Sequence, residues 1–91
     1  MSKKDKKFIN IGFNNTVNSM RVLSVVTPGS SPSKRLINDA RDLGKLVDAT
    51  CGRKTKSVLV MDTGLIILCG LNTSTITRRM NLVEDDVGSE E

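Results

Sequence analysis

Three cations share one short turn of this 91-residue chain, and they are its best-placed groups for binding chemistry. Arg53, Lys54 and Lys56 stand in the run Cys51-Gly52-Arg53-Lys54-Thr55-Lys56. Like charges this close repel one another unless an anion lies between them, so the turn predicts contact with phosphate groups. A basic turn that is simply solvated, with no ligand, is the alternative interpretation.

Arg21 is a second candidate because it stands at the start of an apolar stretch. An arginine in such a stretch extends its head group to water, pairs with a carboxylate, or lies on an exposed binding face. A third candidate is a phosphate contact by Ser33, Lys34 and Arg35, at the start of a predicted helix whose first amides are free. Ordinary capping of that helix is the alternative there, since Pro32 removes one of the N–H groups that a phosphate loop needs.

The composition argues against catalysis and against metal binding. The chain contains no His, which excludes Ser-His-Asp and Cys-His catalysis and histidine metal sites. Its two cysteines, Cys51 and Cys69, are too few for a zinc site, and a disulfide or a redox pair is the functional alternative. We interpret them as small apolar residues of a reduced protein. We therefore predict a protein that is not an enzyme and that uses no metal, cofactor or small-molecule substrate.

Charge is distributed unevenly along the chain. The net charge is +4, but residues 84–91 hold five acids and no base, so residues 1–83 carry all 14 bases against 5 acids, a net charge of +9. A basic body of this kind attracts polyanions, of which DNA and RNA are the commonest in cells. Stacking on single-stranded bases is disfavoured because Phe8 and Phe13 are the only aromatic residues. We predict a disordered basic arm over 1–7, a single domain over 8–82 and a disordered acidic tail over 83–91.

Hydrophobic periodicity predicts an α+β domain with the order β-β-α-β-β-β-α. The alternation in the first strand places Phe13 on the buried face with Ile9 and Ile11, and Ser31 is expected to cap the main helix, which Gly44 ends. A mostly antiparallel sheet, covered on one face by the main helix, follows from this order. The predicted elements are strands over 8–13 and 20–27, a helix over 32–43, strands over 46–49, 58–61 and 65–69, and a short C-terminal helix containing 76–80.

No segment of the chain predicts membrane insertion. The longest apolar run, 65–71, is interrupted by Gly70 and is far too short to span a bilayer. The lysines near the N-terminus are not followed by an apolar run of signal-peptide length. We therefore expect a soluble, cytoplasmic protein whose small core would gain from burial against other copies.

Five short strings and one arginine form a pattern that is specific as a set: Phe8-Ile9-Asn10-Ile11-Gly12-Phe13, Arg21, Ser31-Pro32-Ser33-Lys34-Arg35, Asp39-Ala40-Arg41-Asp42, Leu46-Val47-Asp48-Ala49-Thr50 and Gly52-Arg53. Over about residues 7–82 the chain thereby resembles the RemA family, small bacterial DNA-binding regulators associated with extracellular-matrix and biofilm genes in spore-forming firmicutes. The resemblance implies a transcriptional regulator that binds duplex DNA as a ring-shaped homo-oligomer. It also implies DNA contacts by Arg21, Arg53 and Lys54, the last standing where the family often has Arg.

Two hypotheses about function follow from the residues and from the resemblance. The first is an oligomeric, duplex-DNA-binding transcriptional regulator of the extracellular-matrix type, in which the domain over 8–82 both binds DNA and assembles. Arg21 and the turn around Arg53 are then expected to share one outer rim, copy after copy. The alternative is a non-enzymatic, ring-forming adaptor that binds RNA or an acidic protein, because the same positive charge serves any polyanion.

Overall fold

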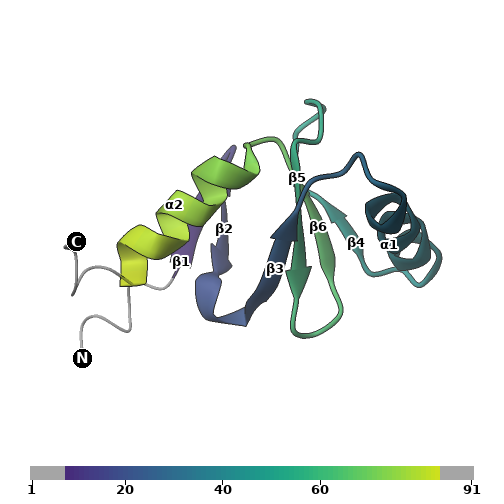
Figure 1. Cartoon of the computed structure of the whole chain (residues 1–91), viewed down its shortest axis with the longest axis horizontal. Coiled ribbons are helices and arrows are strands. Elements are labelled where there is room, and N and C mark those ends of the chain that lie inside the picture. The colour runs from purple at the N-terminus through teal and green to yellow at the C-terminus, as the bar shows by residue number, and fades with distance from the viewer. Residues whose placement is uncertain (1–7, 85–91) are drawn as a thin grey trace.

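The computed structural model describes residues 8–84, so the expected arm over 1–7 and residues 85–91 of the expected tail lie outside this range. Residues 83 and 84, which were predicted to belong to the tail, are part of the last helix. The described residues form six strands and two α-helices, joined in one place by a 3-10 turn, Ser19–Arg21 (Figure 1). In chain order these elements are β1 (Phe8–Gly12), β2 (Asn15–Asn18), β3 (Val22–Val26), α1 (Ser31–Asp42), β4 (Leu46–Asp48), β5 (Ser57–Met61), β6 (Ile66–Cys69) and α2 (Thr73–Glu84).

The predicted α+β class and order of elements are confirmed, with one additional short strand. β2 pairs with β1 as an antiparallel two-stranded sheet, in a segment that the sequence left unassigned. The turn between them is left-handed at three successive residues, Gly12, Phe13 and Asn14. Phe13 therefore stands in this turn and is 39% exposed, so its predicted place on the buried face of the first strand is wrong.

The main helix, α1, begins and ends with local signals that the sequence carries. Ser30 is the N-cap, and its hydroxyl accepts from the amide of Ser33 at 3.2 Å, one residue earlier than the predicted cap at Ser31. Pro32 lies in the first turn, where its missing N–H leaves no partner unsatisfied. Gly44 has a φ of +71°, the left-handed conformation expected just after a helix.

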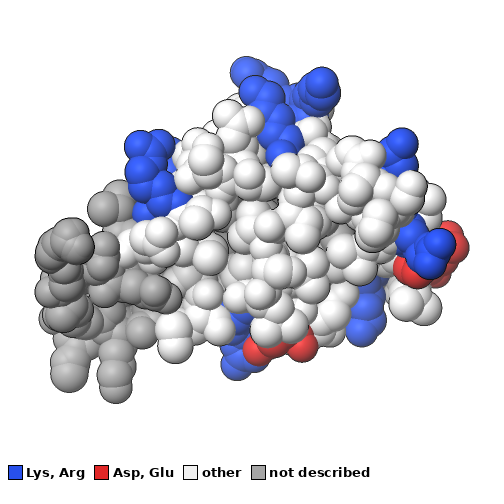
Figure 2. All heavy atoms as spheres, in the orientation of Figure 1, with Lys and Arg blue, Asp and Glu red and all other residues white. Residues whose placement is uncertain are grey.

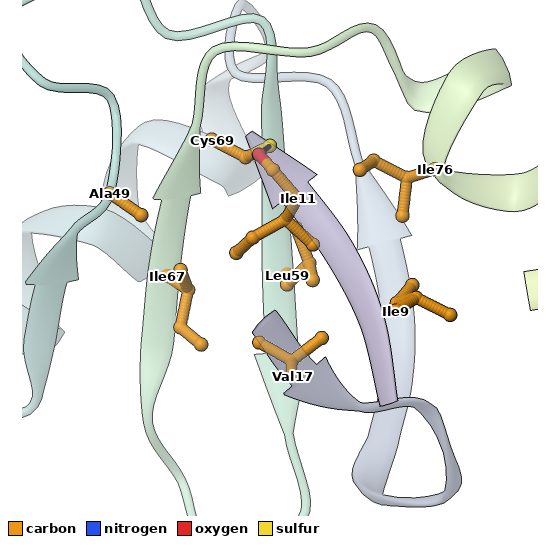
Figure 3. Close-up of a cluster of buried hydrophobic side chains, with 8 residues drawn as sticks. All are labelled: Ile9, Ile11, Val17, Ala49, Leu59, Ile67, Cys69 and Ile76. Atoms are coloured by element: carbon orange, nitrogen blue, oxygen red, sulfur yellow. Dashed lines mark hydrogen bonds between the residues drawn. The ribbon is translucent and has the colours of Figure 1, made fainter. Parts of the chain in front are cut away.

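A four-stranded sheet in the order β3-β5-β6-β4 forms the centre of the molecule. Its pairs are antiparallel except for β4 with β6, which is parallel. Alternation along β5 and β6 sends Val58 and Ile66 to the face that α1 covers. Leu59 and Ile67 point to the opposite face, which the β1–β2 hairpin and α2 cover (Figure 3).

The larger of the two cores lies between the sheet and this hairpin. Ile11 of β1 is 1% exposed and Ile76 of α2 is fully buried. Arg79 holds α2 to β1 at the surface, donating to the carbonyl of Asn10 at 2.8 Å. Neither helix within residues 8–84 is long and apolar enough to cross a membrane.

Candidate nucleic-acid interface

The cationic loop, defined here by Arg53, Lys54 and Lys56, connects β4 to β5 at one end of the sheet. All three side chains are exposed. Figure 2 shows blue spheres gathered above this end of the molecule, where Figure 1 draws the loop. Within residues 8–84 none of the three forms an ion pair with a carboxylate. The loop thus presents three cations that no carboxylate of the described residues pairs with, which is the arrangement expected of a phosphate-binding surface.

Hydrogen bonds at the base of the cationic loop hold it in place. The buried Thr50 donates both its amide and its hydroxyl to Asp48 Oδ1, at 2.9 and 2.6 Å. The amide of Arg53 donates to the carbonyl of Thr50 at 3.0 Å, and the amide of Lys56 donates to the carbonyl of Cys69 at 2.8 Å. The main chain on both sides of the cations is therefore anchored to the sheet, and the charges project from a fixed base.

The β1–β2 turn supports the cationic loop from the side. Asn15 donates through Nδ2 to the carbonyl of Gly12 at 3.1 Å and to that of Ala49 at 3.4 Å, which ties the turn to the end of β4. The guanidinium carbon of Arg53 lies 5.0 Å from the centre of the Phe13 ring. Sequence reasoning missed Phe13 as part of this site. The Gly-Phe-Asn-Asn string, which is typical of a turn, is the signal that could have placed it there.

Arg21 lies far from the cationic loop. Arg21 is the last residue of the 3-10 turn before β3, and its Nη1 donates to Asp62 Oδ2 at 3.1 Å. Of the three expected roles for this arginine, the structure therefore shows pairing with a carboxylate. Its carbonyl accepts from the amide of Asp62. Six residues of an extended strand, or roughly 20 Å, separate Asp62 from Lys56. Arg21 and the loop thus occupy opposite ends of the sheet (Figure 1), and the expectation of one shared rim is wrong within a single chain.

The start of α1 is occupied by its own cap. Ser33 is 5% exposed, its amide donates to the Ser30 hydroxyl, and the two hydroxyls lie 3.0 Å apart. Lys34 and Arg35 are exposed on the first turn. Capping therefore accounts for Ser33, and what remains here is a pair of solvated cations.

The two cysteines are free and differ in environment. Cys69 is fully buried, and its thiol donates to the carbonyl of Ile11 at 3.2 Å, which joins β6 to β1 (Figure 3). It behaves as the small apolar residue that the sequence predicted. Cys51 is exposed at the start of the cationic loop, and the alternative of a disulfide between the two is not realised.

Asp48 gives the base of the loop a dependence on pH. The two bonds from Thr50 stabilise the charged carboxylate and lower the pKa of Asp48 below its ordinary value of 3.8. A lowered pKa means that these bonds contribute fully above pH 3.8 and are lost as the pH falls below it, through the folded-state pKa. Asp48→Asn keeps an oxygen acceptor for Thr50 but does not titrate.

We therefore expect the free energy of unfolding to fall more steeply on acidification in the wild type than in Asp48→Asn. Urea titrations followed by circular dichroism, between about pH 5 and pH 3, measure this difference. Both proteins contain the other carboxylates, so the contribution of those groups to the pH dependence cancels in the comparison. Parallel pH profiles for the two proteins would contradict this role for the Asp48 carboxylate.

Comparison with known proteins agrees with the resemblance seen in the sequence. Residues 8–80 match the RemA-like family, described as extracellular matrix regulatory protein A-like. The chain is 48% identical over 79 residues to the extracellular matrix regulatory protein A of Bacillus subtilis, covering 87% of this chain and 89% of that protein. It is also 49% identical over 84 residues to a protein named as regulatory from Lachnoclostridium phytofermentans, covering 92% of each. A protein named as regulatory from Carboxydothermus hydrogenoformans is 48% identical over 79 residues, which cover 87% of this chain and 91% of that protein. The chain therefore belongs to the RemA-like family of regulatory proteins.

Proposed function

We propose that this protein is a transcriptional regulator that binds duplex DNA and that the cationic loop is its principal contact. The observation that carries the proposal is the set of three exposed cations, unpaired with carboxylates among the described residues, on a loop anchored at both ends. A fixed loop loses little conformational freedom on binding, so more of the attraction to phosphate is retained as affinity. Such a regulator acts in the cytoplasm, where bacterial DNA lies.

The three cations of the loop are suited to different contacts. The planar guanidinium of Arg53 can donate two parallel hydrogen bonds to one phosphate or to the edge of a guanine. Lys54 and Lys56 act as compact point charges that attract phosphate without fixing its orientation. The combination favours recognition of the DNA backbone and its shape, with limited reading of base sequence.

Arg21 is a separate proposed contact, at the opposite end of the sheet. Its guanidinium is bonded to Asp62, and both side chains are more than a third exposed, so the pair is weak and a phosphate can replace the carboxylate. We expect Asp62→Asn to strengthen DNA binding about two- to threefold and Arg21→Ala to weaken it by a similar factor, as befits one exposed charge. Fluorescence anisotropy with a labelled duplex measures both. Weaker binding by Asp62→Asn would mean that phosphate does not compete for Arg21.

Assembly into a ring of identical copies is the second part of the proposal. β3 and β4 are the outer strands of the central sheet, and each presents an edge without a partner strand within residues 8–84. Leu23 on β3 is 68% exposed and Val47 on β4 is 41% exposed, so apolar surface accompanies these edges. When one surface of each copy binds a different surface of the next, the copies form a closed ring if the successive rotations add up to a full turn. A ring would repeat the cationic loop, and each further contact with one duplex would then be intramolecular.

The experiment that tests the function measures both the mass of the assembly and its binding to DNA. Light scattering with and without a long duplex reports assembly, and anisotropy titrations over a range of salt concentrations report binding. We expect a mass of several copies and an affinity for duplex DNA that falls steeply with salt. Tighter binding of structured RNA or of an acidic protein than of duplex DNA at about 0.15 M salt would favour the adaptor instead.

A further inference from the structure

The β1–β2 turn and the cationic loop meet at one pair of side chains, Phe13 and Arg53. The Arg53 Cζ atom lies 5.0 Å from the centre of the Phe13 ring, within the range of a cation–π contact. Gly70, just after β6, lies beside both side chains. A Cβ atom there would be 3.5 Å from Phe13 Cε2 and 3.7 Å from Arg53 Cβ, so the two side chains pack over a segment that has no side chain of its own.

The backbone at Phe13 adopts a conformation that is rare for an aromatic residue. Its φ is +55°, between Gly12 at +104° and Asn14 at +65°. Glycine and asparagine are the usual residues in this region, and a bulky side chain is disfavoured. Burial does not account for the ring, which is 39% exposed. An unusual backbone conformation that holds an exposed ring against a cation points to a role for that contact.

We infer that Phe13 is a positioning residue, which holds the Arg53 guanidinium in the orientation that meets a DNA phosphate. The inference rests on the proposed function of the cationic loop. The Arg53 Cζ atom lies over the ring, so the contact restricts the guanidinium on one side while its N–H groups can still donate to phosphate oxygens. Because the ring already restricts the arginine, less side-chain entropy is lost when DNA binds. Among the described residues, this cation–π contact is made by Arg53 and by neither Lys54 nor Lys56.

Three substitutions of Phe13 test this role. Phe13→Leu keeps an apolar side chain but removes the aromatic face, and we expect it to weaken binding of a short duplex about two- to fivefold. Phe13→Tyr keeps the ring and is expected to retain wild-type affinity. Phe13→Asn tolerates the left-handed backbone, so it loses the ring without adding backbone strain. It is expected to weaken binding as Phe13→Leu does, with no loss of stability in urea titrations.

The effect of Phe13 has to depend on Arg53. In an Arg53→Ala background, Phe13→Leu is expected to leave the affinity for DNA unchanged, because the ring acts only through that side chain. An equal loss of affinity with and without Arg53 would overturn the inference, since Phe13 would then contact DNA or support the fold directly. Wild-type affinity in both Phe13→Leu and Phe13→Asn would overturn it as well.

A measurement on the free protein separates this inference from the proposed function. The NMR resonance of the Arg53 Hε proton is expected to be shifted by the aromatic ring, and to move to the position of an unrestrained arginine in Phe13→Leu. A resonance that does not move would overturn the positioning role even where Arg53→Ala abolishes DNA binding. A resonance that moves, with DNA binding unaffected by Arg53→Ala, would instead overturn Arg53 as a DNA contact and, with it, the use of this cation–π contact in DNA binding.

Discussion

Replacing Arg53, Lys54 and Lys56 together by alanine is expected to weaken binding to a duplex short enough to contact one cationic loop by on the order of 100-fold at 0.15 M salt. The plot of log affinity against log salt concentration has a negative slope, and each phosphate contact makes it steeper by about 0.9. The loss of three contacts therefore makes the slope shallower by about 2.7. At 0.15 M salt the same relation converts three contacts into roughly two powers of ten. Anisotropy titrations at several salt concentrations measure both quantities. The fold should survive, because all three side chains are exposed and the loop is anchored through its main chain.

A matched variant distinguishes the cationic loop from the overall positive charge. Substituting Lys34, Arg35 and Arg41 by alanine also removes three positive charges, in this case from exposed positions on α1. We expect this variant to weaken binding by less than about tenfold, through the long-range field alone. Equal losses in the two triple variants would mean that DNA responds to net charge and that the loop is not the contact surface. A larger loss in the α1 variant would move the proposed surface to that helix.

The elements that could be predicted from the sequence are those whose signals are local. β5 and β6 are apolar runs on either side of a short turn, and α1 has a serine cap, an early proline and a terminal glycine. β2 was missed because Val17 is its only buried apolar residue, so there is no alternation to detect. The parallel pairing of β4 with β6 joins strands distant in the sequence, and no local pattern specifies it.

The candidate site was predicted only in part, because some of its contacts join residues that are distant in the sequence. Arg53, Lys54 and Lys56 fall within four consecutive residues, so the sequence alone identifies this cluster of cations. The position of Arg21 depends on the register of β3 against β5, in which Val22 stands opposite Met61, and that register places it far from the loop. Phe13 continues the alternation of Ile9 and Ile11, but the backbone turns at Gly12 and carries the ring out of the core and towards Arg53. Such contacts are set by tertiary structure, which periodicity does not report.

Ile11→Ala is expected to lower the free energy of unfolding by about 2–5 kcal/mol, a large part of the ~4–12 kcal/mol expected for a domain of this size. Ile11 is 1% exposed in the core between the sheet and the β1–β2 hairpin, and its carbonyl accepts from the buried Cys69 thiol (Figure 3). Urea titrations followed by circular dichroism measure the loss. Ile11→Val, which removes one methyl group, should cost about 0.5–1.5 kcal/mol, and Leu43→Ala, at a side chain 72% exposed, less than about 0.5 kcal/mol. A loss below about 1 kcal/mol for Ile11→Ala would mean that β1 does not pack on the sheet, and the support that its turn gives to the cationic loop would fail with it.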